Sequence, residues 1–181
     1  MSQRNSGYAR KQNDAYYTPS WVTEALINSG YPFRGPVWEP ACGNGNIVNV
    51  LKHRFQVVAT DMATTEIDFM KCDLAVPGVQ AIITNPPYTE SATFIQHAID
   101  LMRPVGGQVA MLLRTDYDHA ATRKYLFGSC PQFAKKLVLL KRIVWFVEAN
   151  GKPRASPSFN HAWYVWDWRH DGSPTIGYIG G

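Results

Sequence analysis

Apolar segments that alternate with amphipathic helical segments constrain this chain more than any other feature of its sequence. Four apolar segments typical of strands cover residues 37–38, 55–60, 79–84 and 109–113. Helical spacing of apolar residues is found at 47–51 and 91–102, and another helix is expected to start at Thr18-Pro19 and end before Gly30. Because parallel strands need crossover connections, the alternation predicts an α/β fold, with a mostly parallel sheet and helices on both faces.

The last part of the chain has a different pattern. Two apolar segments, 137–147 and 162–168, are separated only by a loop at 150–160 that is rich in Gly, Pro and Ser. Since this loop cannot hold a crossover helix, we expect the two strands to pair antiparallel as a C-terminal hairpin. With 181 residues, 45% of them hydrophobic, the chain is expected to form one domain in which residues 1–14 are a flexible basic arm.

Polar residues stand directly after three of the predicted strands. They are Glu39, Asp61 and Asn85. In open α/β sheets, ligands bind outside the carboxyl ends of the strands. The sequence therefore predicts a ligand site at this edge of the sheet.

The turn after the first strand has the sequence Glu39-Pro40-Ala41-Cys42-Gly43-Asn44-Gly45. Its glycines would let the backbone approach a ligand closely at the start of the next helix. Asp61 could hold the two hydroxyls of a ribose, and Asp73 could accept a hydrogen bond from an adenine amino group. A dinucleotide site, or a tight turn with solvated acids, would explain the same features. Against a dinucleotide, a third glycine is missing, and Glu39 would repel pyrophosphate but attract an ammonium group.

The segment Asn85-Pro86-Pro87-Tyr88 follows the apolar strand at 79–84. The exocyclic amine of adenine is a poor nucleophile because its lone pair is delocalised into the ring. The Asn85 side-chain oxygen and the Pro86 carbonyl could accept from its two hydrogens and favour a pyramidal, electron-rich nitrogen. The prolines would hold these acceptors in place, and Tyr88 offers a ring on which a base can stack. The alternative is a rigid turn that only ends a strand.

Together these segments resemble the class I S-adenosylmethionine-dependent methyltransferases, and among them the enzymes that methylate the amino group of adenine in DNA. The resemblance spans residues 16–168 and implies a Rossmann-like methyltransferase fold whose last two strands form an antiparallel edge hairpin. It implies S-adenosylmethionine as the cofactor, and catalytic roles for Asn85, Pro86, Pro87 and Tyr88. The cofactor-binding residues that it implies are Tyr17, Thr18, Pro19, Glu39, Pro40, Ala41, Cys42, Gly43, Gly45, Asp61, Met62, Asp73 and Leu74.

The resemblance favours DNA over other substrates of enzymes with the Asn-Pro-Pro-Tyr motif. RNA adenine methyltransferases and protein glutamine methyltransferases share it. The glutamine enzymes usually carry an amino-terminal helical domain, for which the stretch before Trp38 is too short, and the segment Tyr16-Tyr17-Thr18-Pro19 favours DNA over RNA. Given its length of 181 residues, we expect the chain to contain no separate target-recognition domain. A non-catalytic module that binds cofactor or nucleic acid is a further alternative, against which the intact motif at 85–88 argues.

Charge is distributed unevenly along the chain, although the net charge is only +4. Between residues 135 and 154, six lysines and arginines stand against one acid. Such a segment suits a polyanionic partner such as nucleic acid, or else a solvated surface. We predict that Lys152 and Arg154, in the loop at 150–160, contact the phosphate backbone of the substrate; the alternative is a solvated hairpin connection.

The three cysteines and the polarity of the chain indicate neither a metal site nor a membrane segment. Cys42, Cys72 and Cys130 lie far apart, so we expect free thiols and no metal. No segment approaches the roughly 18 apolar residues of a membrane span, and residues 1–11 lack the apolar core of a signal peptide. We therefore expect a soluble, cytoplasmic protein.

Overall fold

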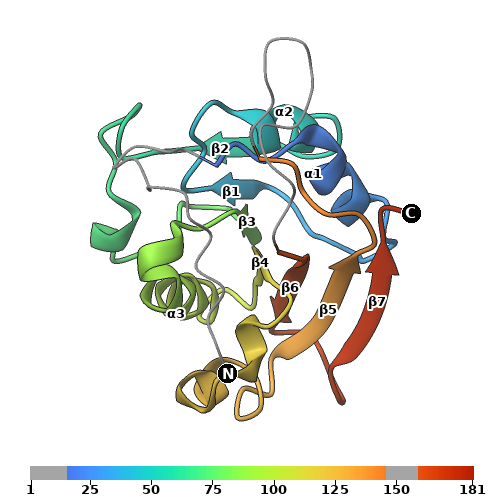
Figure 1. Cartoon of the computed structure of the whole chain (residues 1–181). Helices are drawn as coiled ribbons and strands as arrows, with labels where there is room; N and C mark the ends of the chain where they lie inside the picture. Colours follow the sequence, from blue (N-terminus) through green and yellow to red (C-terminus); the bar gives the residue numbers. More distant parts are fainter. Residues whose placement is uncertain (1–15, 146–158) are drawn as a thin grey trace.

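A computed structural model describes residues 16–145 and 159–181, and within them the strands form one mixed sheet (Figure 1). The order across the sheet is β2-β1-β3-β4-β6-β5-β7. The strands are β1 (Val37–Glu39), β2 (Val57–Ala59), β3 (Ala81–Thr84), β4 (Gln108–Arg114), β5 (Phe133–Leu139), β6 (His161–Asp167) and β7 (Thr175–Ile179). The α-helices are α1 (Ser20–Ile27), α2 (Asn46–Leu51) and α3 (Ser91–Met102), and short 3-10 turns are η1 (Phe69–Lys71), η2 (Tyr88–Glu90), η3 (Tyr117–His119) and η4 (Ala121–Leu126).

The first four strands are parallel, and helices cover both faces of the sheet, as the sequence pattern predicts. Alternate side chains of one strand enter different cores: Ile82 packs on the side of α3, whereas Ala81 and Ile83 pack on the side of α1 and α2. Figure 1 shows α3 on one side of the strands and α1 with α2 on the other. This arrangement confirms the predicted Rossmann-like α/β fold.

The C-terminal strands differ in part from the prediction. β5 and β6 do pair antiparallel, but β5 ends at Leu139 and does not reach residue 147. The apolar residues that follow it serve other contacts: Ile143 is buried beneath α1, and Trp145 packs on other aromatic rings. The hairpin does not lie at the edge of the sheet as predicted, because β7, which was not expected, lies at the edge and pairs parallel with β5. Lys152 and Arg154 lie outside the described residues.

The start of α1 is one residue later than predicted. Pro19, rather than Thr18, is the N-cap residue, and its extended backbone precedes the first helical residue, Ser20. The Thr18 side chain makes no capping hydrogen bond; instead the residue is buried and its carbonyl oxygen accepts from Asn46 Nδ2 at 3.1 Å. The segment that precedes α1 is thus fastened to the start of α2, beside the turn at 39–45.

Every helix within residues 16–145 and 159–181 is too short or too polar to span a lipid bilayer. The same residues contain no group of three or more His, Cys, Asp or Glu side chains placed to hold a metal ion. Cys42, Cys72 and Cys130 are free thiols.

Candidate active site

The carboxyl ends of β1, β2 and β3 bring Glu39, Asp61 and Asn85 to one edge of the sheet. β1 lies between β2 and β3 and pairs with both in parallel. The Thr60 N–H donates to the Glu39 carbonyl at 3.0 Å, and the Gly43 N–H donates to Asp61 Oδ2 at 2.9 Å. Hydrogen bonds therefore join the turn that follows β1 to the residues that follow β2.

The turn at 39–45 depends on its two glycines. Gly43 and Gly45 have φ angles of +49° and +83°, in the left-handed region that favours glycine. A side chain at position 43 would also approach the ring of Tyr17, which lies 3.4 Å from the place of its Cβ atom. Tyr17 therefore covers one side of this turn, while the Cys42 N–H ties the turn to β2 through the Thr60 carbonyl.

Glu39 is fully buried at the base of this turn. Its Oε1 atom accepts from the Thr84 hydroxyl at 2.5 Å and from the Ala41 N–H at 3.2 Å. Its Oε2 atom is buried without a hydrogen-bond partner in the described structure. Burial raises the pKa of this carboxyl group to about 8, although the Thr84 and Ala41 hydrogen bonds act in the opposite direction. A buried carboxyl oxygen without a partner marks a position for a polar group of a ligand, since the described residues supply none there.

Asp61 directs its carboxylate at backbone N–H groups on two sides. Oδ2 accepts from Gly43, and Oδ1 accepts from Ala63 at 2.8 Å. The Thr65 hydroxyl closes the turn by bonding both the N–H and the carbonyl of Asp61. Each carboxylate oxygen has a further lone-pair direction, so Asp61 can hold the turn at 39–45 and still accept from the hydroxyls of a ligand.

Three residues of the implied cofactor site lie on exposed connections. Met62 follows β2, and Asp73 and Leu74 lie between η1 and β3. No strand forms at 72–80, so Asp73 lies in an irregular connection between η1 and β3. Leu74 is 81% exposed, which leaves its side chain free to cover a ligand that enters this edge.

Asn85 has one end of its amide fixed and the other open. Its Nδ2 group donates to the Tyr16 carbonyl at 3.2 Å, and its Oδ1 atom is buried without a partner among the described residues. Because the nitrogen is taken by Tyr16, the oxygen is left as the acceptor at the carboxyl end of β3. Pro86 is buried and Pro87 exposed, and together they lead the chain into η2 at Tyr88.

Aromatic rings surround Tyr88. The Tyr16 ring meets it edge-to-face at a centroid distance of 5.4 Å, and Trp145 meets both rings, at 5.5 Å from Tyr16 and 6.4 Å from Tyr88. Burial raises the pKa of the Tyr88 phenol above its ordinary value. Behind Trp145, the His161 ring lies 5.2 Å away, and burial together with the charge of Arg114 lowers the pKa of His161 to about 4.

The sequence analysis did not predict that Trp145 contacts the rings of Tyr16 and Tyr88. The only available signal was a tryptophan in the run at 143–147, which the sequence interpretation assigned to a strand. In the structure, Trp145 lies beyond the end of β5, and its ring reaches the turn that holds Asn85.

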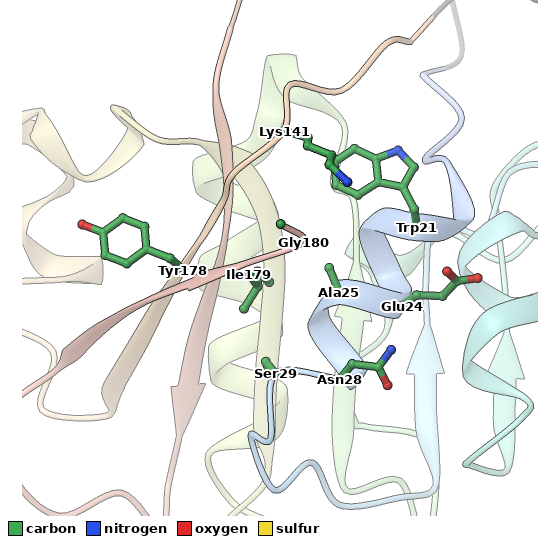
Figure 2. Close-up of a pocket in the computed structure, with 10 residues that line it drawn as sticks. Trp21, Glu24, Ala25, Asn28, Ser29, Lys141, Tyr178, Ile179 and Gly180 are labelled. Atoms are coloured by element: carbon green, nitrogen blue, oxygen red, sulfur yellow. The ribbon is translucent and has the colours of Figure 1, made fainter.

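Two grooves lie beside α1. One, of about 520 Å³, borders the turn at 39–45 and is lined by Tyr17, Pro19, Trp21, Asn44, Asn46, Arg142, Val144 and Trp145. The other, of about 640 Å³, lies between α1 and the end of β7, where Figure 2 shows Trp21 and Glu24 from the helix and Lys141 from the chain after β5. Neither groove is lined by Glu39, Asp61 or Asn85, so the buried acceptors of the site belong to neither.

Comparison with solved structures places this fold among methyltransferases. A Streptococcus thermophilus type I restriction-modification methyltransferase subunit superposes with a TM-score of 0.62 at 11% identity, over 90% of this chain and 47% of the other. The EcoKI M protein, of a type I restriction enzyme, superposes with a TM-score of 0.53 at 12% identity, and the match covers 93% of this chain and 49% of that protein. A Listeria monocytogenes protein assigned to the class I S-adenosylmethionine-dependent methyltransferases superposes with a TM-score of 0.58 at 13% identity. This match covers 95% of this chain and 68% of that protein.

The chain therefore has the fold of the class I S-adenosylmethionine-dependent methyltransferases. It spans about half the length of the two restriction-modification subunits. The sequence matches no protein-family model and no curated protein.

Proposed function

We propose that this protein transfers a methyl group from S-adenosylmethionine to the exocyclic amine of adenine in DNA. The observation that carries the proposal is the Asn85 amide, whose oxygen is a buried acceptor without a partner while its nitrogen is held by Tyr16. This acceptor lies at the carboxyl end of β3, next to the turn of β1 that suits a cofactor. The fold is shared with class I S-adenosylmethionine-dependent methyltransferases.

The residues of the β1 and β2 ends fit S-adenosylmethionine. Glu39 offers its unpartnered Oε2 atom to the ammonium group, directly or through water, and Asp61 offers its remaining lone pairs to the ribose hydroxyls. The Gly43 and Gly45 backbone lets a ligand approach closely, with Tyr17 to one side. When bound, the cofactor would supply an electrophilic methyl group on a sulfonium. Met62, Asp73 and Leu74 are proposed to contact its adenine end.

Asn85 and the Pro86 carbonyl would act on the amine of the substrate. Two acceptors that face its two hydrogens favour the pyramidal nitrogen, whose lone pair forms the new bond to carbon as the bond from carbon to sulfur breaks. The nitrogen then loses one proton to water. Tyr88 would stack on the base, a contact worth about 1–3 kcal/mol, after the base rotates out of the double helix.

DNA is the preferred substrate in this proposal. Two structural neighbours are methyltransferase components of type I restriction systems, which supports a nucleic-acid substrate. An adenine amine in RNA presents the same two hydrogens to Asn85, so RNA is the alternative that the experiment must separate.

The test is to incubate the protein with S-adenosylmethionine labelled in the methyl group and, separately, with DNA, RNA and a protein mixture. Mass analysis of the digested nucleosides should show labelled N6-methyladenine from DNA. Asn85→Ala should abolish most of this product, whereas Asn49→Ala, an exposed asparagine on α2, should leave it unchanged. Label in RNA alone or in protein would overturn the choice of DNA. Tight binding of NAD with no binding of S-adenosylmethionine would overturn the methyltransferase proposal.

A further inference from the structure

Two arginine side chains are stacked on aromatic rings near the end of β4. The Arg114 guanidinium carbon lies 3.9 Å from the centroid of the Phe159 ring, and that of Arg123 lies 3.9 Å from the centroid of Tyr117. Arg114 is the last residue of β4, and Arg123 lies in η4. β4 is the parallel neighbour of β3, which ends at the Asn85 turn, so Arg114 lies at the same edge of the sheet as that turn.

Hydrogen bonds connect the Arg123 stack to this turn. The Tyr117 hydroxyl lies 2.8 Å from Ser91 Oγ, and the Ser91 hydroxyl donates to the Tyr88 carbonyl at 3.2 Å. Tyr117 therefore holds Arg123 on one side and Tyr88, through Ser91, on the other. Arg114 lies close enough to Tyr88 for its charge to lower the pKa of the phenol, against the larger effect of burial.

The two guanidinium groups differ in how many of their N–H donors are already hydrogen-bonded. Arg114 donates to both carboxylate oxygens of Asp116, from Nε at 3.0 Å and from its terminal nitrogen at 2.6 Å. The Arg123 side chain makes no hydrogen bond or ion pair with any residue that the structure describes; it contacts the Tyr117 ring and, at longer range, feels the charge of Asp116. Five N–H donors of Arg123 are thus left for a ligand.

A stacked guanidinium group is well prepared to bind an anion. The ring fixes the plane of the group, so less side-chain entropy is lost when its N–H edge meets an acceptor. Phosphate oxygens match that edge in charge and geometry. An acidic protein surface would match the charge as well, but the site beside these arginines carries the base-stacking ring Tyr88, which favours nucleic acid.

We propose that Arg123, positioned by Tyr117, binds a backbone phosphate of the nucleic-acid strand that presents the target base to Asn85. Arg114, positioned by Phe159, contributes a weaker contact because Asp116 already neutralises much of its charge. The inference rests on the proposed function for its partner, but it assigns residues that the methyl-transfer chemistry does not use.

The test measures binding of fluorescein-labelled DNA, as duplex and as single strand, by anisotropy at several KCl concentrations and with S-adenosylhomocysteine present. Loss of one phosphate contact lowers the slope of log affinity against log salt by about 0.9 for duplex and about 0.7 for single strands. Arg123→Gln should show this change, and Arg123→Lys should restore the slope because the charge remains. Arg114→Gln should change the slope less. In turnover assays, Arg123→Gln should raise KM for DNA and leave kcat nearly unchanged.

Arg103→Gln is the matched control. Arg103 follows the C-terminal end of α3, the end of this helix away from the turn at 85–88, and pairs with Asp100 at 3.3 Å on an exposed surface. Its loss removes the same charge, so equal slopes for Arg103→Gln and Arg123→Gln would overturn the phosphate contact. If the unaltered protein methylates adenine while those slopes are equal, this inference fails and the proposed function stands. If the slope depends on Arg123 but no base is methylated, the phosphate contact stands and the proposed function fails. No binding to any nucleic acid would overturn both.

Discussion

The buried carboxyl group of Glu39 makes the stability of the ligand-free protein depend on pH in a predictable direction. Its pKa is raised from about 4.5 in the unfolded chain to about 8 in the folded protein, chiefly because burial disfavours the charged form. Between these values the unfolded chain has lost a proton that the folded protein keeps. The stability contributed by neutral Glu39 is therefore fully present below pH 4.5, and it is lost as the pH rises toward 8.

The size of this pH effect on the free energy of unfolding follows from the linkage between proton binding and folding. Over the window where only the folded protein binds the proton, the free energy of unfolding falls by about 1.4 kcal/mol per pH unit. Between pH 5 and pH 7, Glu39 should therefore remove about 2 to 3 kcal/mol from the stability of the unaltered protein. That is a large part of the roughly 5–15 kcal/mol by which proteins are usually stable.

Glu39→Gln tests this reasoning, because glutamine can still accept from the Thr84 hydroxyl but cannot ionise. The free energy of unfolding is measured by urea denaturation at pH 5, 6 and 7, with linear extrapolation to water. The free energy of unfolding of the variant minus that of the unaltered protein should become more positive by about 2 to 3 kcal/mol from pH 5 to pH 7, whatever the difference is at pH 5. His161, whose pKa is lowered to about 4, titrates in the opposite sense, and its effect cancels in this difference.

Glu24→Gln controls for the loss of one negative charge, since Glu24 is an exposed acid on α1. A Glu39→Gln difference that stays constant from pH 5 to pH 7 would refute the reasoning. It would mean that Glu39 has the same pKa in the folded and the unfolded chain, and so that it is solvated rather than buried against Thr84.

Three further predictions concern the ligands. Asp61→Ala should weaken S-adenosylhomocysteine binding by about 1.5–3 kcal/mol in calorimetry, because charge-assisted hydrogen bonds to the ribose are lost; unchanged affinity would contradict the assigned role. Asn85→Ala should lower kcat by roughly 10²–10³ and leave the affinity for S-adenosylhomocysteine intact, since its acceptor matters most in the transition state. Tyr88→Ala should raise KM for DNA as well as lower kcat, and an unchanged KM in steady-state assays would exclude the stacking contact.

Local pattern was enough to predict the elements around the candidate site. The helix predicted at 91–102 is α3 (Ser91–Met102), because one apolar face of that segment, with Phe94 and Ile95 among its residues, packs against the sheet. The polar strand ends were equally predictable, since ligands in open α/β sheets bind at the carboxyl ends of the strands and are met there by polar residues. Glu39 and Asn85 are such residues, each directly at the carboxyl end of its strand.

The C-terminal strands were harder to predict because apolar residues there have two uses. Residues 137–147 contain an apolar run, yet only its first part belongs to β5. Ile143 fills the core beneath α1, and Trp145 packs on Tyr16 beyond the end of the strand. β7 is short and largely exposed, with Gly177 in its centre, so it lacks the apolar alternation by which a strand is recognised.

The geometry of the candidate site depends on contacts that no local pattern contains. The sequence names Asn85 as an acceptor, but which end of its amide is left without a partner is decided by the carbonyl of Tyr16, 69 residues earlier. In the same way, Glu39 is held by Thr84, 45 residues later, because the register of the parallel pair β1 and β3 sets the ends of the two strands side by side. Since Thr84 precedes Asn85 and Glu39 begins the turn at 39–45, one hydrogen bond between strand ends links the proposed cofactor turn to the proposed catalytic turn. In the proposed function, sheet register would therefore set the distance between cofactor and substrate, because sites built on strands are held more precisely than sites on loops.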